Sequence, residues 1–151
     1  ADPLAALREF HRAMAVGGLL MFSTLGPDTL AELRAAAGAE RVHSFADMHD
    51  LGDMLVAAGF AEPVMDTERV TIVYAQGASL LADLRASGQT CALMARARGL
   101  AGRQFHVSLL AKLAAQRREG KLPVSYEVVY GHAWKAAPKR IADGRSVVRF
   151  S

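Results

Sequence analysis

The chain has 151 residues, of which 52% are hydrophobic and 22% are charged, as in soluble globular domains. No apolar run approaches the ~20 residues that a membrane span requires, and no basic start with an apolar stretch indicates a signal peptide. Cys91 is the only cysteine, which excludes an intrachain disulfide and favours a reducing, cytoplasmic setting.

The net charge of +3 hides an uneven distribution along the chain. Residues 1–84 carry 5 Lys and Arg against 12 Asp and Glu, whereas residues 85–121 carry 8 Lys and Arg against Glu119 alone. The basic charge is therefore concentrated in one middle segment, which the mean value does not reveal.

The chain opens with signals for a helix followed by a strand. Asp2 is a capping residue, Pro3 suits the first helical turn, and Gly17-Gly18 ends the helix. The apolar run 19–22 predicts a strand covered on both faces, as in a parallel sheet. Because no earlier strand is present to pair with it, we expect either a fragment or a domain completed by another copy.

Two further helices and a second strand come next. A turn at 23–28 leads into a helix that Gly38 ends. Ser44 begins a third helix, with Asp47 three residues on, close to a capping box. The apolar spacing over residues 64–74 then predicts a strand.

Residues 77–121 have helical apolar spacings, and Gly120 ends the last helix. The last strand is predicted from Val124 to Trp134, where the even positions are large and the odd positions are small or polar. We therefore expect Tyr130 and Trp134 to pack in the core. Helices alternate with strands along the chain, which favours an α/β sheet fold.

Three segments resemble the final part of a class I S-adenosylmethionine-dependent methyltransferase: Gly17–Pro27, Ala57–Phe60 and Val124–Trp134. The resemblance implies the C-terminal half of a Rossmann-like sheet, with strands five, six and seven, the seventh running antiparallel between the other two. It divides the chain into a methyltransferase part, 1–135, with a helical substrate-side insertion at 77–121, and a basic tail, 136–151.

Four further runs resemble the malonyl-[acyl-carrier protein] O-methyltransferases of biotin synthesis, namely Met48–Asp53, Pro63–Asp66, Asp83–Arg85 and Tyr126–Trp134. The resemblance implies methyl transfer from S-adenosylmethionine to the free carboxylate of a malonyl thioester on acyl carrier protein. A related family, the complex I assembly hydroxylase built on a methyltransferase fold, shares some of these features. It stays an alternative, as does a non-catalytic binding or assembly module.

The cofactor loop of this superfamily has the spacing Gly-x-Gly and follows its first strand. No two of the 13 glycines of this chain have that spacing. The resemblance therefore implies that S-adenosylmethionine is bound mainly by an absent N-terminal half and that this chain alone is inactive. No cofactor-binding residue is assigned.

Four residues are candidates for substrate binding. Ser23 and Thr24 follow the first strand, where ligands of open α/β sheets bind, although turn and capping chemistry explains them as well. Tyr126 and His132 offer hydrogen-bond donors to the acyl or pantetheine group, with internal packing as the alternative. No catalytic residue is assigned, because a carboxylate is already a nucleophile and the reaction depends on alignment.

The resemblance implies that acyl carrier protein is the partner of the basic segment. Acyl carrier proteins are strongly acidic, and a positively charged face would steer them into contact. An arginine also suits a malonyl carboxylate. The alternatives are a solvated helix face and a nucleic-acid face, but the acidic residues 1–84 and the lack of interleaved aromatics argue against nucleic acid. The candidate carrier-protein contacts are Arg96, Arg98, Arg103, Lys112, Arg117 and Arg118.

A short acidic and histidine-containing segment raises the question of a metal site. On a helix its three aspartates drift around the surface, and acidic residues early in a helix already favour its dipole. We therefore expect no metal. The residues concerned are His43, Asp47, His49, Asp50 and Asp53.

Overall fold

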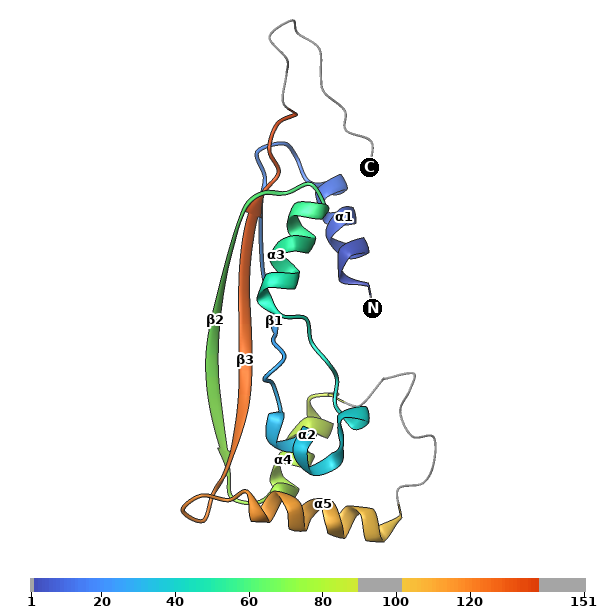
Figure 1. Cartoon of the computed structure of the whole chain (residues 1–151), viewed down its shortest axis with the longest axis vertical. Helices are drawn as coiled ribbons and strands as arrows, with labels where there is room; N and C mark the ends of the chain where they lie inside the picture. Colours follow the sequence, from blue (N-terminus) through green and yellow to red (C-terminus); the bar gives the residue numbers. More distant parts are fainter. Residues whose placement is uncertain (1, 90–101, 139–151) are drawn as a thin grey trace, which may run out of the picture. The chain divides into compact units, whose positions relative to one another are not determined.

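The computed structural model describes residues 2–89 and 102–138. Within these ranges helices alternate with three strands (Figure 1), so the α/β expectation is confirmed. The elements in chain order are α1 (Pro3–Ala13), β1 (Leu19–Leu25), α2 (Ala31–Ala37), the 3-10 turn η1 (Ala39–Arg41), α3 (Met48–Ala57), β2 (Ala61–Tyr74), α4 (Gly77–Ala86), α5 (Arg103–Ala115) and β3 (Leu122–Trp134).

The described residues form two compact units. Unit 1 consists of residues 2–24, 47–66 and 129–138, and it contains α1 and α3. Unit 2 consists of the described residues of 25–46 and 67–128, and it contains α2, η1, α4 and α5. Each of the three strands contributes residues to both units.

The strands form one sheet in the order β1-β3-β2, so the last strand of the chain lies between the first two. This is the order that the resemblance implies. Gly17 N donates to Lys135 O at 2.7 Å in unit 1, and Gly26 N donates to Glu127 O at 2.9 Å in unit 2. Because the partner's number falls as the residue number rises, β3 runs antiparallel to β1.

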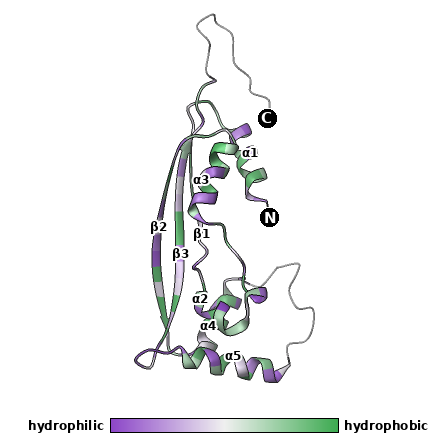
Figure 2. Cartoon of the chain, in the orientation of Figure 1, coloured by the Kyte–Doolittle hydropathy of each residue, from purple (hydrophilic) through white to green (hydrophobic). Residues whose placement is uncertain are grey.

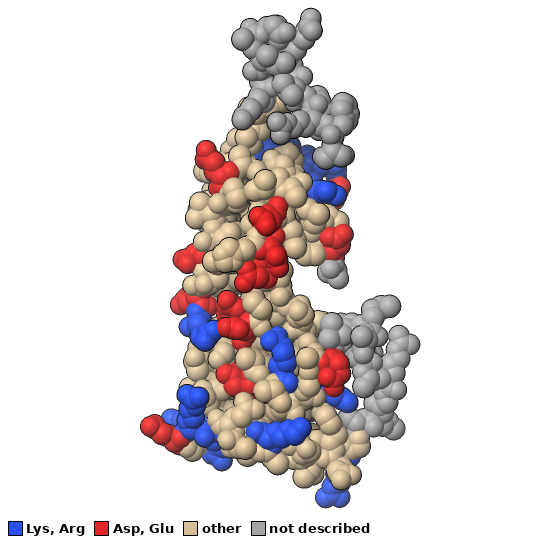
Figure 3. All heavy atoms as spheres, in the orientation of Figure 1, with Lys and Arg blue, Asp and Glu red and all other residues tan. Residues whose placement is uncertain are grey.

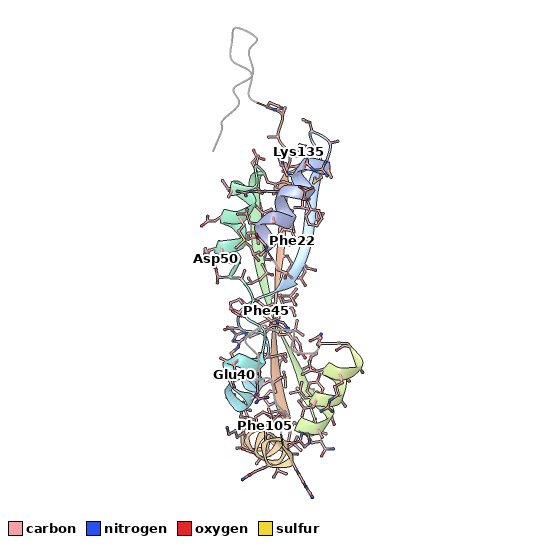
Figure 4. All side chains as sticks on the ribbon, turned by 90° about the vertical axis from the view of Figure 1, so that its right-hand side faces the viewer. Phe22, Glu40, Phe45, Asp50, Phe105 and Lys135 are labelled. Carbon is pink, nitrogen blue, oxygen red and sulfur yellow. The ribbon has the colours of Figure 1, made fainter. Side chains whose placement is uncertain are left out.

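The core of unit 1 lies between α1, α3 and one face of the strands. Asp2 caps α1, as predicted, by accepting a hydrogen bond from Ala5 N at 3.1 Å. Lys135 Nζ, labelled in Figure 4, donates to the carbonyls of His11 and Met14 near the end of this helix. Helices α1 and α3 carry hydrophilic as well as hydrophobic residues (Figure 2), and the buried ones include Leu7, Leu55, Ala58, Phe60 and Ala133.

The core of unit 2 brings α2, α4 and α5 onto the strands. Leu80, Leu113, Leu122 and Val124 have no exposed surface. These buried leucines confirm the apolar faces predicted for α4 and α5. The remaining buried residues of this core are Leu30, Leu33, Ala36, Val42, Tyr74, Leu84 and Leu109.

The expectation that the first strand is covered on both faces is wrong for the described residues. Exposed and partly buried positions alternate along most of β1, and Leu19 and Met21 are 40% and 72% exposed. The physical reason is that Leu20 and Phe22 pack on the core of unit 1, whereas Leu19 and Met21 point to the opposite face of the strand.

The expectation that Tyr130 and Trp134 are core residues is also wrong, since they are 43% and 42% exposed. The small odd positions of β3 face the core of unit 1 instead, and Ala133 is fully buried there. Gly131 illustrates why only small residues fit on this face, because a Cβ at this position would lie 2.4 Å from Cζ of Phe22. The larger side chain of Phe22 fills the space that a small β3 residue leaves.

Several element boundaries differ from the prediction. Helix α2 begins at Ala31, since Leu30 has a positive φ of 57°. Helix α3 begins at Met48, and Asp47 rather than Ser44 is its N-cap. Helix α5 ends at Ala115, ahead of Gly120, which lies in a turn with φ +76°.

No helix within 2–89 or 102–138 is both long enough and apolar enough to span a membrane. Cys91, Arg96, Arg98 and most of the basic tail lie outside the described residues.

Candidate functional site

The turn that follows β1 is held against β3 by a cluster of hydrogen bonds in unit 2. Asp28 N donates to Oε2 of Glu127 at 2.8 Å, and Thr29 Oγ1 donates to the Glu127 carbonyl at 3.1 Å. Thr29 is fully buried. At Gly26 a Cβ would lie 2.5 Å from the Glu127 carboxyl carbon, so no larger residue fits without moving that side chain. The carboxyl end of β1 is therefore fixed in position.

Arg34 ties the same turn to the segment that follows η1. Its guanidinium donates to the carbonyl of Pro27 at 2.8 Å, of Thr29 at 3.3 Å and of His43 at 3.2 Å. Asp28, at the turn itself, forms an ion pair with Arg69 of β2. These bonds to backbone carbonyls fix the turn after β1 relative to the segment around His43.

A first hollow, which we call the tyrosine hollow, has a volume of about 380 Å³ and is lined by Tyr74, Asp83 and Tyr126 among others. Tyr74 OH donates to the Asp83 carboxylate at 3.1 Å. Burial, reinforced by the neighbouring Tyr126 and by Asp83, raises the pKa of Tyr74. Burial is also the main cause that raises the pKa of Tyr126. Both hydroxyls therefore stay protonated and can donate.

A second hollow, the Arg41 hollow, also measures about 380 Å³. Leu25, the last residue of β1, is one of its lining residues. Leu84 and Gln89 line both this hollow and the tyrosine hollow. Arg41 stacks on the ring of Phe105, with 4.1 Å between Cζ and the ring centroid. The walls are mainly apolar, and the residues around the opening are Leu25, Leu30, Leu33, Arg41, Val42, His43, Phe45, Leu84, Gly88 and Gln89.

A third, larger hollow of about 1140 Å³ is basic. Thr71, Val73 and Ser125 line it from odd positions, whereas Ile72, Tyr74 and Tyr126 line the tyrosine hollow from even positions. The two hollows therefore lie on opposite faces of the β2–β3 pair. The basic hollow is defined by four cationic side chains, Arg69, Arg117, Arg118 and Lys121.

The carboxylates of the basic hollow offset only part of this charge. Glu32 is held by Ser125, whose N and Oγ donate to it at 2.9 Å and 2.7 Å, and Glu119 lies in the turn after α5. Within the described ranges no ion pair involves Arg117, Arg118 or Lys121. Figure 3 shows basic side chains gathered at the end of unit 2 where α5 lies.

The four predicted substrate residues fall in different units. Ser23, Thr24 and His132 belong to unit 1, where Ser23 is exposed and Thr24 lines an apolar hollow of about 180 Å³. Tyr126 belongs to unit 2 and lines the tyrosine hollow. Their role in substrate binding stays a prediction.

The predicted basic contacts are gathered only in part. Arg117 and Arg118 line the basic hollow, whereas Arg103 and Lys112 are exposed on α5. Arg117 also donates to the carbonyl of Gly120 and so stabilises the turn after α5. Arg96 and Arg98 lie outside the described residues.

The acidic segment that resembled a ligand set has a structural role at the start of α3. Asp47 accepts hydrogen bonds from N and Nδ1 of His49, at 2.8 Å and 2.7 Å, and these bonds lower the pKa of Asp47. Across the described part of the chain, no group of three His, Cys, Asp or Glu residues is arranged to hold a metal.

Several residues of these hollows were not predicted. Arg41 and Gln89 carry no local signal of a shared site, because they line the same hollow only when η1 packs near the end of α4. Glu127 was part of a recognised run, but its contact with Asp28 joins residues 99 positions apart. No pattern of neighbouring residues indicates such a contact.

The turn after β1 does not have the form of a nucleotide-binding loop. Gly26 is the glycine of the turn after β1, and its open side is filled by Glu127. The helix that follows, α2, has only 7 residues and begins after Leu30 in a left-handed conformation. This turn lacks the glycine-rich entry into a helix that binds a nucleotide.

Comparison with known proteins identifies relatives over nearly the whole chain, although no protein-family model matches it. The malonyl-[acyl-carrier protein] O-methyltransferase of Laribacter hongkongensis is 52% identical over an alignment of 155 positions that covers 98% of this chain and 52% of that protein. The protein of the same name from Gallionella capsiferriformans is 52% identical and matches 99% of this chain and 53% of its own length. The malonyl-[acyl-carrier protein] O-methyltransferase 1 of Coxiella burnetii is 46% identical, and the match covers 88% of this chain and 48% of that protein.

These similarities confirm the resemblance that the sequence motifs indicated. The chain spans about half the length of the curated relatives it matches.

Proposed function

We propose that this chain, a relative of the malonyl-[acyl-carrier protein] O-methyltransferases, is the substrate-side half of such an enzyme. The reaction transfers a methyl group from S-adenosylmethionine to the free carboxylate of a malonyl thioester on acyl carrier protein, in the cytoplasmic synthesis of biotin. The observation that carries the proposal is the 52% identity to the Laribacter protein over 98% of the chain.

The sheet supports an assignment of β1, β2 and β3 to strands five, six and seven of the methyltransferase fold. The order β1-β3-β2 has the last strand in the middle. In unit 1 the face of β1 and β3 away from the core exposes Leu19, Met21 and Trp134. We assign this apolar face and the open edge of β1 to contact with the cofactor-binding half, because exposed apolar patches commonly mark interaction surfaces.

The proposed reaction requires this half to bind and align the substrate, and it requires no catalytic base. One carboxylate oxygen forms a bond to the methyl carbon while the bond from that carbon to sulfur breaks, which gives a methyl ester and a neutral thioether. A carboxylate needs no base to act as nucleophile, so alignment and exclusion of water supply the rate enhancement. The Arg41 hollow, with its mainly apolar walls and few polar groups, suits the binding of a small acyl group, and the tyrosine hollow adds hydrogen-bonding side chains.

The basic hollow supports an acidic carrier protein as partner. Arg117, Arg118 and Lys121 are exposed, and they add a local positive charge to a chain whose first 84 residues are acidic. Complementary charge of this kind steers association and orients the partner more than it tightens the complex. We assign the docking of acyl carrier protein to the basic hollow and to the exposed face of α5.

A chimera tests the proposed function. This chain replaces the matched residues of the Laribacter protein, and a second protein lacks those residues without replacement. The chimera should transfer labelled methyl groups from S-adenosylmethionine to malonyl acyl carrier protein, whereas this chain alone and the truncated protein should not. A soluble, folded chimera that binds S-adenosylmethionine and transfers no label would refute the proposal.

A further inference from the structure

The Arg41 hollow combines features that suit a small acyl group ending in a carboxylate. Its walls are apolar, with Leu30, Leu33 and Phe45 among them, and its polar groups are few, chiefly Arg41, His43 and Gln89. Its volume of about 380 Å³ lies in the range of small-molecule sites. Figure 4 labels Phe45, Glu40 and Phe105 in this part of unit 2.

The guanidinium of Arg41 packs on an aromatic ring and forms only a long ion pair with its neighbour Glu40. The ring of Phe105 covers one face of the group at 4.1 Å, which leaves the in-plane N–H groups as donors. Its ion-pair partner Glu40 is 3.7 Å away from Nε, beyond hydrogen-bonding distance, and is 55% exposed. The Glu40 carboxylate lies instead against Gly38, where a Cβ would be 2.5 Å from its Oε2.

The hollow also lies where a substrate of this sheet is expected. Leu25, the last residue of β1, forms part of its wall, and ligands of open α/β sheets bind beyond the carboxyl ends of the strands. Leu84 and Gln89 line both this hollow and the tyrosine hollow, so the two hollows are neighbours in unit 2.

We propose that the Arg41 hollow binds the carboxylate end of the malonyl group and that Arg41 is the residue that recognises it. This inference rests on the proposed function, since it names the substrate-binding part of that site. Charge-assisted hydrogen bonds from the N–H groups of Arg41 select a dicarboxylic thioester over a neutral acyl thioester. The mainly apolar walls lower the local dielectric around the carboxylate, which strengthens the interaction.

Binding to the full chain, without a methyl donor, tests the inference. Malonyl-pantetheine and acetyl-pantetheine serve as probes, because they differ by the terminal carboxylate, and binding is followed by nuclear magnetic resonance titration. We expect malonyl-pantetheine to bind about tenfold more tightly than acetyl-pantetheine. Arg41→Met should remove this difference and leave acetyl binding unchanged. Arg41→Lys, which keeps the charge but loses the planar fork, should retain only part of it.

Arg12→Met is the matched control, since Arg12 is exposed on α1 and lines none of the three hollows of unit 2. Equal affinity for the two probes, no detectable binding of malonyl-pantetheine, or full selectivity in a folded Arg41→Met variant would each overturn the inference. These results would leave methyl transfer by the chimera unaffected. Conversely, an inactive chimera would leave the selectivity of the chain for a carboxylate in place, so the two proposals fail separately.

Discussion

The carboxylate of Glu127 accepts a hydrogen bond from the backbone amide of Asp28, with 2.8 Å between Oε2 and N. This bond joins the turn after β1 to the middle of β3, next to the buried hydroxyl of Thr29. Glu127→Ala should lower the free energy of unfolding by about 0.5–1.5 kcal/mol, the usual net value of one hydrogen bond. Glu127→Gln keeps an acceptor oxygen and should cost less. Urea unfolding measures both, and equal losses would show that the bond to Asp28 does not matter.

Gly131 allows Phe22 and Met65 to pack against β3 in unit 1. A Cβ at Gly131 would lie 2.4 Å from Cζ of Phe22 and 2.9 Å from Sδ of Met65. Gly131→Ala should therefore destabilise the protein by about 1–3 kcal/mol, because both side chains must move within a packed core.

A second glycine of unit 1 provides the control for that measurement. A Cβ at Gly52, inside α3, would make an ordinary contact of 3.6 Å with Met65. Gly52→Ala should stabilise the protein by up to about 1 kcal/mol, since alanine favours a helix interior over glycine. Thermal unfolding that placed the two variants in the reverse order would contradict the packing described for β3.

Tyr74 and Tyr126, which line the tyrosine hollow of unit 2, predict a loss of stability at alkaline pH. The pKa of Tyr74 and the pKa of Tyr126 are both raised in the folded protein, mainly by burial. The folded state therefore keeps protons that the unfolded state releases above about pH 10, so the stabilisation is complete below that pH and is lost as the pH rises beyond it.

Urea unfolding at about pH 8 and about pH 11 measures this loss. Replacing both residues by phenylalanine should reduce the fall in stability between the two conditions, because the groups that titrate are gone. A fall of the same size in the double variant would show that other groups cause the alkaline effect.

The basic hollow predicts a rate of association that depends on salt. Arg118→Glu with Lys121→Glu should slow binding of acyl carrier protein about tenfold at low salt, and the difference should shrink as salt is added. Arg117 is left unchanged, because its bond to the Gly120 carbonyl holds the turn. Arg8→Glu with Arg12→Glu makes the same change of charge on α1 and should have little effect. Equal slowing by both pairs would argue against docking at the basic hollow.

Local patterns predicted the helices and strands of this fold, but not which face of each strand is buried. The capping signals at Asp2 and Gly38 correctly indicated where helices begin and end. The exposure of Tyr130 could not be read from alternation alone, since both faces of β3 have apolar residues and the side chains of neighbouring elements decide which face is covered.

The candidate site was less predictable than the fold, for a physical reason. The sequence indicated the basic segment and Tyr126, because charge runs and aromatic alternation are local properties. Arg41 sits beside Glu40 in a polar stretch typical of a solvated turn. Its role depends on Phe105, which lies 64 positions later and reaches Arg41 only when α5 packs in unit 2.

The central claim is that this chain supplies the acceptor side of a carboxyl methyltransferase, and the intact mass of acyl carrier protein tests it most directly. After incubation with the chimera and S-adenosylmethionine, malonyl acyl carrier protein should gain the mass of one methyl group in place of a proton, and acetyl acyl carrier protein should gain none. An unchanged malonyl carrier protein, under conditions in which the intact Laribacter protein adds the methyl group, would contradict the claim.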